Sequence, residues 1–341
     1  MAKNVGRTTV IAGIIASLLA LAQGCKSTRE EAATPESTRQ TVEAAKLALK
    51  FTPGQTTTYK VTTEAEKSVE WQGNTSNKPT SFRGGRTGHH IEMTFEQQVQ
   101  RVDDQGHATL KITIKALKYL GRRRETVALD FDSSRPADQS SPFAKLIGQS
   151  YGLEMSPQGE VLAVTDVEPA RGALQGNSPE QQTALKLLDE PIIKTRHEIS
   201  ALMALPAEAA RSGQRWSDVK SFAFGMMGAA SFERVYTLET LADADGAGVA
   251  VVTMSAIPSS ALAQEQHAAQ PSNVLDQMFD STESYEGRLE LSLDTGEIVE
   301  YTEQLHMQWV AADPTAAESG VANPAVLNMG ATQRYRLDRV K

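Results

Sequence analysis

Apolar and polar residues alternate along most of the chain with a period of two residues. In the first half the alternation covers residues 57–63, 91–99, 110–116 and 127–131. In the second half it covers residues 232–238, 249–251, 289–293, 299–309 and 329–337. This period is typical of strands with one buried and one solvated face, which antiparallel sheets tolerate. The sequence therefore predicts a mainly β fold of antiparallel sheets.

Between the two halves the pattern becomes helical. Ser178 is a suitable N-cap, Pro179 occupies the favoured first helical position, and Gln181 can complete a capping box. Leucine and alanine then recur at helical spacing, and Pro191 interrupts the run. We expect a second helix over residues 192–204, so that a short helical hairpin bridges the β halves. A further short helix is predicted over residues 41–49.

Four local signatures occur in the same order in both halves. The pairs are Gly54-Gln55 with Gly213-Gln214, residues 104–108 with 245–250, residues 131–134 with 279–282, and residues 159–166 with 296–303. One interpretation is a duplicated β unit, giving units at 51–170 and 207–341 around a helical insert at 171–206. The other is that Asp, Gly and Ser mark turns in any antiparallel protein.

The N-terminus has the features of a secretory signal peptide at residues 1–24. Lys3 and Arg7 precede an apolar run over residues 10–21. As a helix, such a run spans about 18 Å, well short of a hydrocarbon core of about 30 Å. An uncleaved membrane anchor is therefore the weaker alternative.

Leu21-Ala22-Gln23-Gly24-Cys25 places the single cysteine directly after this run. The segment resembles the lipobox of bacterial lipoproteins, in which a small residue precedes the cysteine and an aliphatic residue lies further upstream. The resemblance implies cleavage before Cys25, acyl chains such as palmitate on its sulfur, and a membrane-anchored envelope protein. Lys26 favours the outer membrane, facing the periplasm. Secretion with a free thiol remains an alternative, and residues 25–50 are expected to form a tether.

Charge limits the partners of the chain. The net charge of −8 becomes −10 once Lys3 and Arg7 are removed with the signal peptide. An acidic body disfavours both nucleic acid and an anionic membrane surface as the main partner. We therefore expect the protein to contact the membrane through the acyl chains on Cys25. Arg122-Arg123-Arg124 is the one dense basic cluster, and it lies where a hairpin turn is expected. A solvated turn is the simpler interpretation, and an anion or lipid-headgroup contact is the alternative.

Histidines are poorly placed for a metal site. His89 and His90 are adjacent and point to opposite faces if they lie on a strand, so an exposed loop pair is the favoured interpretation. Arg196-His197-Glu198 is expected on a surface helix. The chain contains no nucleophile elbow or phosphate-binding glycine loop in its proper context. We therefore predict no metal, no cofactor and no enzymatic activity.

Two further stretches have competing interpretations. Asp130 and Asp132 share one strand face, as a Ca²⁺ site or glycosidase requires, but the following Ser-Ser-Arg-Pro favours a strand end. Met226-Met227, with Phe222 and Phe224 nearby, forms either a buried strand or the flexible lip of an apolar pocket.

The chain resembles a family of bacterial lipoproteins known only as a domain of unknown function. The matching residues are Tyr59, Asp130 to Ser134, Pro157 to Val161, and Gly213 to Trp216. The resemblance implies an envelope location and a β-rich fold. We expect a non-catalytic binding or structural role. The alternatives are a carrier of a lipid or acyl chain between sheet and helices, which an apolar cavity of several hundred Å³ would favour, and an unrecognised hydrolase.

Overall fold

The computed structural model describes residues 44–73, 84–206, 209–224, 228–244, 247–259, 280–312 and 325–340. All of them belong to the compact unit that begins at Arg39. The predicted signal peptide, Cys25, and the Met226-Met227 pair lie outside the described residues. Within the described part of the chain, no helix is both long enough and apolar enough to cross a membrane.

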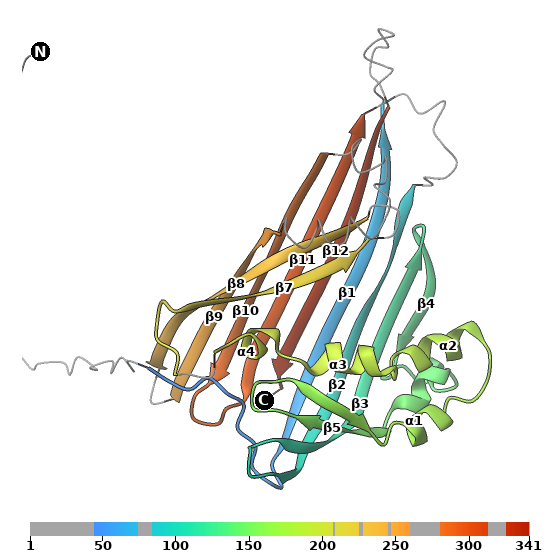
Figure 1. Ribbon diagram of the computed structural model, residues 1–341. Helices are drawn as coiled ribbons and strands as arrows, with labels where there is room; N and C mark the ends of the chain where they lie inside the picture. The colour runs from blue at the N-terminus through green and yellow to red at the C-terminus, as the bar shows by residue number, and fades with distance from the viewer. Residues whose placement is uncertain are drawn as a thin grey trace, which may run out of the picture. The chain divides into compact units, whose positions relative to one another are not determined.

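The fold is mainly β and antiparallel, as the alternation predicts (Figure 1). The strands are β1 (Thr56–Gln72), β2 (Gly85–Val102), β3 (Ala108–Arg123), β4 (Thr126–Asp132), β5 (Ser150–Met155), β6 (Val161–Thr165), β7 (Arg215–Ala223), β8 (Ala229–Ala244), β9 (Ala247–Pro258), β10 (Asp280–Ser292), β11 (Ile298–Ala312) and β12 (Val326–Arg339). They form one sheet in the order β6-β5-β3-β2-β1-β12-β11-β10-β9-β8-β7, with β4 on β3. Both halves of the chain thus contribute to a single sheet, joined by β1 and β12.

Strands β4 and β5 occupy successive stretches along the same neighbour. Asp132 at the end of β4 is opposite Lys118 of β3, and Ser150 at the start of β5 is opposite Thr113. Two short 3-10 helices, η1 (Pro136–Asp138) and η2 (Pro142–Leu146), lie between them. A 17-residue insertion over 133–149 therefore interrupts what is otherwise one strand position.

Four helices connect the two edge strands β6 and β7. They are α1 (Glu168–Gly172), α2 (Pro179–Lys186), α3 (Glu190–His197) and α4 (Ser200–Met203). The capping box predicted at Ser178 and Gln181 is present. The predicted second helix is wrong in extent: Pro191 lies in the first turn of α3, and the helix breaks at Glu198. The break frees the backbone N–H of Ile199 to donate to Gly159 O, 3.0 Å away.

One face of the sheet, here called the inner face, carries the apolar residues and contacts the helices. His197 of α3 lies edge-on to Phe95 of β2, with ring centroids 4.7 Å apart. Trp216 of β7 donates to Ala201 O of α4 at 2.9 Å. The sheet also curls so that the end of β7 comes close to β11: Phe224, which follows β7 directly, packs on Trp309 of β11 with ring centroids 5.1 Å apart. The buried residues of both halves form one continuous core.

Residues 44–50 are extended, so the short helix predicted near them is wrong over this range. Ala45 exchanges two backbone hydrogen bonds with Ala210, each 2.9 Å long, and Leu49 N donates to Pro157 O at 2.8 Å. Leu47 and Leu49 are buried in the core. Pairing with loops of the body satisfies these backbone groups, and the isolated first turn of a short helix would not.

Two of the repeated sequence signatures form the same local structure. Gly54 and Gln55 exchange backbone hydrogen bonds with Val99 at 2.8 and 2.9 Å, and Gly213 and Gln214 do the same with Leu238 at 2.7 and 3.0 Å. Gly54 and Gly213 have φ of 85° and 81°. Each strand partner is followed at once by a bulge, in β2 after Val99 and in β8 after Leu238. The β1–β2 and β7–β8 pairs therefore begin alike.

The turns at Gly159 and Gly296 also correspond. Gly159, with φ of 76°, ends the β5–β6 turn, and Gly296, with φ of 64°, ends the β10–β11 turn. Each donates its N–H to a serine carbonyl at 2.9 Å, Ser156 in one case and Ser292 in the other. Each turn follows a bulge. These correspondences favour duplication over a chance recurrence of turn residues.

Candidate functional site

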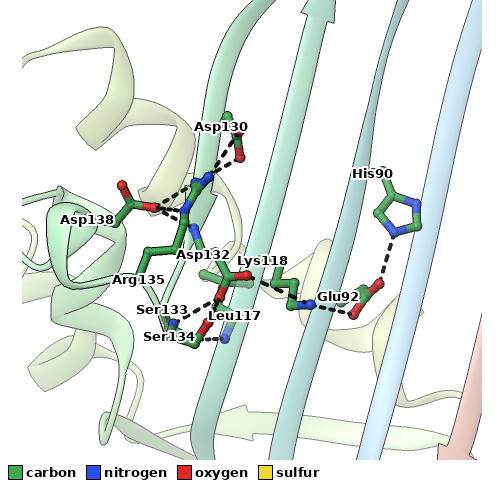
Figure 2. A network of polar contacts seen from close by, with 10 residues as sticks. All are labelled: His90, Glu92, Leu117, Lys118, Asp130, Asp132, Ser133, Ser134, Arg135 and Asp138. Carbon is green, nitrogen blue, oxygen red and sulfur yellow. Dashed lines mark hydrogen bonds and ion pairs between the residues drawn. The ribbon is translucent and has the colours of Figure 1, made fainter.

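Asp130 and Asp132 lie at the end of β4, as the strand-end interpretation predicts (Figure 2). Arg135 donates to Asp130 at 2.8 Å and to Asp138 at 2.7 Å. Asp132 accepts from the backbone N–H and the hydroxyl of Ser134, and these bonds hold the pKa of its carboxyl below the ordinary value. Both carboxylates are therefore engaged in stabilising the turn.

A row of charged side chains crosses β2, β3 and β4 on the face opposite the helices, here called the outer face. His90 lies 3.4 Å from Glu92, Lys118 lies 3.9 Å from Glu92, and Lys118 lies 3.8 Å from Asp132 (Figure 2). Exposed pairs of this kind contribute little to stability, on the order of 0–1 kcal/mol each. They keep this part of the sheet polar.

His89 and His90 lie within strand β2, so the predicted exposed loop is wrong. The predicted opposition of their side chains holds, because strand neighbours point to opposite faces. His89 stacks on Tyr119, with ring centroids 6.2 Å apart. Burial, and then the nearby His90, lowers the pKa of His89. The two rings therefore serve different surfaces and do not form a ligand pair.

Arg196 and His197 are buried, so the predicted surface position of Arg196-His197-Glu198 is wrong for these two residues. His197 Nε2 lies 2.8 Å from Tyr151 Oη, and Arg196 donates to that hydroxyl at 3.3 Å and to Leu187 O at 2.8 Å. Burial, and then Arg196, places the pKa of His197 well below its ordinary value. The helix ends at His197, which lets both side chains enter the core and find polar partners.

The Arg122-Arg123-Arg124 cluster lies at the predicted hairpin turn, with Arg122 and Arg123 at the end of β3. Arg124 and Glu125 link β3 to β4, with positive φ of 51° and 68°. Such values are uncommon outside glycine and asparagine, although two-residue hairpin turns require them. Glu125 anchors the turn by accepting from Arg86 N at 3.0 Å.

A buried ionic cluster on the inner face was missed from the sequence. Arg234 of β8 donates to Asp218 of β7 at 2.7 Å and to Glu303 of β11 at 3.2 Å, and Lys220 donates to Glu303 at 3.0 Å. The hydroxyls of Tyr285 and Tyr301 also donate to Glu303. The sequence did contain a signal for this cluster. Each charged residue lies two positions from an aromatic residue of its strand, and so on the same, inward face; this is true of Asp218, Lys220, Arg234 and Glu303.

The cluster is electrically balanced and fully engaged. Burial alone would raise the pKa of Glu303, but Lys220, Arg234 and the two tyrosine hydroxyls hold it below the ordinary value. Two cations face two carboxylates, so no net charge is left in the core. The cluster fastens the β7–β8 hairpin to β11.

The spaces near the helices are small. A hollow of about 30 Å³ lies near Phe95, Met155 and Ile199. This is about the volume that one water molecule occupies in the liquid. The space beside Ala201, Tyr236 and Tyr301 does not admit a water. Neither space has the several hundred Å³ expected of a carrier, so that hypothesis gains no support from them.

A larger hollow, of about 260 Å³, lies around Gly88 of β2 and is here called the Gly88 hollow. Glu66 of β1 and Arg122 of β3 are the register partners of Gly88 on either side. The neighbouring row of the sheet supplies Glu64, His90 and Leu120 to the lining. Glycine leaves the space between the two long charged side chains unfilled.

The charges at the Gly88 hollow are not all satisfied. Glu64 pairs with Arg334 at 3.1 Å, and His90 contacts Glu92. The side chains of Glu66 and Arg122 make no hydrogen bond or ion pair with the part of the chain that the structure describes. Two opposite charges therefore face one hollow from opposite sides. Among the described residues, no group of three or more His, Cys, Asp or Glu is arranged for a metal ion.

No curated protein matches the chain. A lipovitellin chain, solved in work on lipid–protein interactions in lipovitellin, has a TM-score of 0.37 and 15% identity over 86% of this chain and 26% of that chain. This chain thus spans about a quarter of the lipovitellin chain. Residues 105–298 match the family described as "Family of unknown function (DUF6263)". The match covers more than half of the sequence, and the chain belongs to this family.

Proposed function

We propose that the protein is a lipid-anchored protein of the cell envelope with a non-catalytic binding role. Acyl chains on Cys25 hold it to the membrane, in the outer membrane facing the periplasm. The lipobox-like segment and Lys26 support this location. Two or three acyl chains bind a bilayer far more firmly than one, because each buried methylene contributes about 0.8 kcal/mol.

The observation that carries the binding role is the Gly88 hollow. Buried polar clusters elsewhere in the described chain are internally paired, as at Glu303, and so are accounted for by folding. Glu66 and Arg122 differ, because each presents a charge to the hollow without a partner among the described residues. Neighbouring strands fix the backbone positions of both residues, so a ligand that satisfies both charges would find an acid and a base on opposite sides of one hollow.

Native mass spectrometry of the full protein, extracted in detergent from its own membrane, tests this role. We expect a small bound species on the natural protein and its loss from Glu66→Gln and Arg122→Gln variants. Glu70→Gln and Arg123→Gln change exposed charges outside the hollow and serve as matched controls. A bare protein at every gentle ionisation setting, or an adduct that all four variants retain, contradicts the proposal.

A further inference from the structure

We propose that the Gly88 hollow binds an α-amino-carboxylate, a head group with an ammonium and a carboxylate on one carbon. This inference rests on the proposed binding function and names the ligand chemistry of the same site. Glu66 would accept hydrogen bonds from the ammonium group, and Arg122 would donate to the carboxylate. The source can be a free amino acid or an amino-acid head group on a larger molecule.

The positions of the two residues across the sheet fit this head group. Glu66 and Arg122 lie on the strands flanking β2, both in register with Gly88. Because neighbouring strands lie about 4.8 Å apart, their backbones are separated by about 10 Å. In an α-amino acid the nitrogen and a carboxylate oxygen lie about 3 Å apart. The Glu66 and Arg122 side chains, with one charge-assisted hydrogen bond of about 2.8 Å at each end, cover the rest of this distance, so one head group can bridge the two strands.

The chemistry of the walls excludes simpler ligands. A plain anion would be attracted by Arg122 and repelled by Glu66, and a plain cation would meet the reverse. Glu64 is already paired with Arg334, which leaves Glu66 as the acid without a partner among the described residues. A guanidinium group is well suited to a carboxylate, since its planar fork donates two parallel hydrogen bonds.

The volume of the hollow also suits such a head group. Pockets for drug-sized molecules measure about 300–1,000 Å³. The Gly88 hollow measures about 260 Å³, so it suits one amino-acid head group with a small side chain. Leu120 gives the lining an apolar surface that a methyl group can contact. Gly88 cannot be replaced by a larger residue without a clash, since a Cβ there would lie 2.2 Å from Ala65 O.

The inference is tested by isothermal titration calorimetry, which measures the affinity of the full chain in detergent for three matched probes. L-alanine carries both charges, N-acetyl-L-alanine carries only the carboxylate, and L-alaninamide carries only the ammonium. We expect saturable binding of L-alanine and at least a tenfold loss of affinity for each of the other two probes. Glu66→Gln and Arg122→Gln should each weaken L-alanine binding at least tenfold, and Glu70→Gln and Arg123→Gln should not.

The charge-swapped double variant Glu66→Arg with Arg122→Glu provides the sharpest control, because it can hold the same ligand in the reverse direction. We expect it to regain part of the affinity that either single neutral variant loses. Absence of saturable L-alanine binding to the natural protein overturns the inference. Equal binding of N-acetyl-L-alanine that depends on Arg122 also overturns it, but leaves the proposed binding function standing with an anion as ligand.

Discussion

Glu303 is the residue whose surroundings most constrain the core. It accepts from Tyr285 and Tyr301 and pairs with Arg234 and Lys220 in a region that is almost fully shielded from solvent. A buried ion pair gains little relative to a well-packed apolar core, but removal of one partner leaves the other charge unbalanced. The cluster thus specifies how the β7–β8 hairpin docks on β11.

We predict that Glu303→Gln lowers the free energy of unfolding by about 3 kcal/mol, because the buried Arg234 and the half-buried Lys220 both lose a carboxylate partner, although Arg234 keeps Asp218. Glu300→Gln on the outer face removes the exposed pair with Arg336 and should change it by less than about 1 kcal/mol. Urea unfolding of both variants measures the difference. Similar small effects from the two substitutions would show that the cluster does not fasten the hairpin.

The burial of the His197 side chain predicts that the stability of the protein depends on pH. The pKa of His197 is far below the ordinary value in the folded protein, mainly through burial, so the unfolded chain takes up a proton that the folded chain excludes. The free energy of unfolding should therefore fall as pH drops below about 6.5. His197→Gln, which stays neutral, should reduce that slope, and His306→Gln at an exposed site should not. An unchanged slope in His197→Gln contradicts the assignment.

Among single residues, the sequence predicted partners where the partner is close along the chain. The capping box at Ser178 and the strand-end position of Asp132 depend on residues within three positions. His197 was placed wrongly because its partner Tyr151 is 46 residues away and reaches it only through the fold. The placement of Glu66 and Arg122 on opposite sides of Gly88 depends on strand register, which alternation alone does not give.

At the scale of elements, glycines mark where strands and turns approach closely. A Cβ at Gly88 would lie 2.2 Å from Ala65 O and 2.7 Å from Glu66 Cα, both backbone atoms of β1. Backbone atoms of a paired strand cannot move aside as a flexible side chain can. The absence of a side chain at Gly88 therefore allows β1 and β2 to approach closely and also leaves the hollow unfilled.

We predict that Gly88→Ala destabilises the protein by about 1–3 kcal/mol, because β1 and β2 must separate locally to accept the methyl group. Gly172→Ala is the matched control: nothing lies within 4 Å of a Cβ there, and the residue ends helix α1. Alanine should be neutral or stabilising at that position by up to about 1 kcal/mol. Thermal unfolding compares the two, and equal melting temperatures contradict the close approach.

Strands were predicted more reliably than helices because the strands are longer, so their sequence period repeats more often. The alternation continues through strands such as β11, of 15 residues, whereas no helix exceeds 8 residues within the described chain. In such short helices the ends are decided by tertiary contacts, as Ile199 shows by donating to Gly159 O. The α1 helix, of 5 residues, carries no periodic signal and was not predicted.

At the scale of the whole molecule, the halves form one sheet whose two edges are connected by the helices (Figure 1). The antiparallel β class was predictable from alternation, but the union of the halves through β1 and β12 was not. That pairing joins residues up to 280 positions apart, such as Tyr59 and Arg339, and no local pattern encodes it. The outer face then remains available for ligands, while the inner face is occupied by the core.

The account as a whole depends on attachment to a membrane through Cys25. We predict that Cys25→Ser abolishes labelling by palmitate and moves the protein from the membrane fraction to a soluble or unprocessed form. The measurement that tests this most directly is the intact mass of the mature protein from its native membrane. We expect a chain beginning at Cys25 that carries two or three acyl chains. A chain that begins upstream of Cys25, or begins there without added lipid mass, would contradict the account.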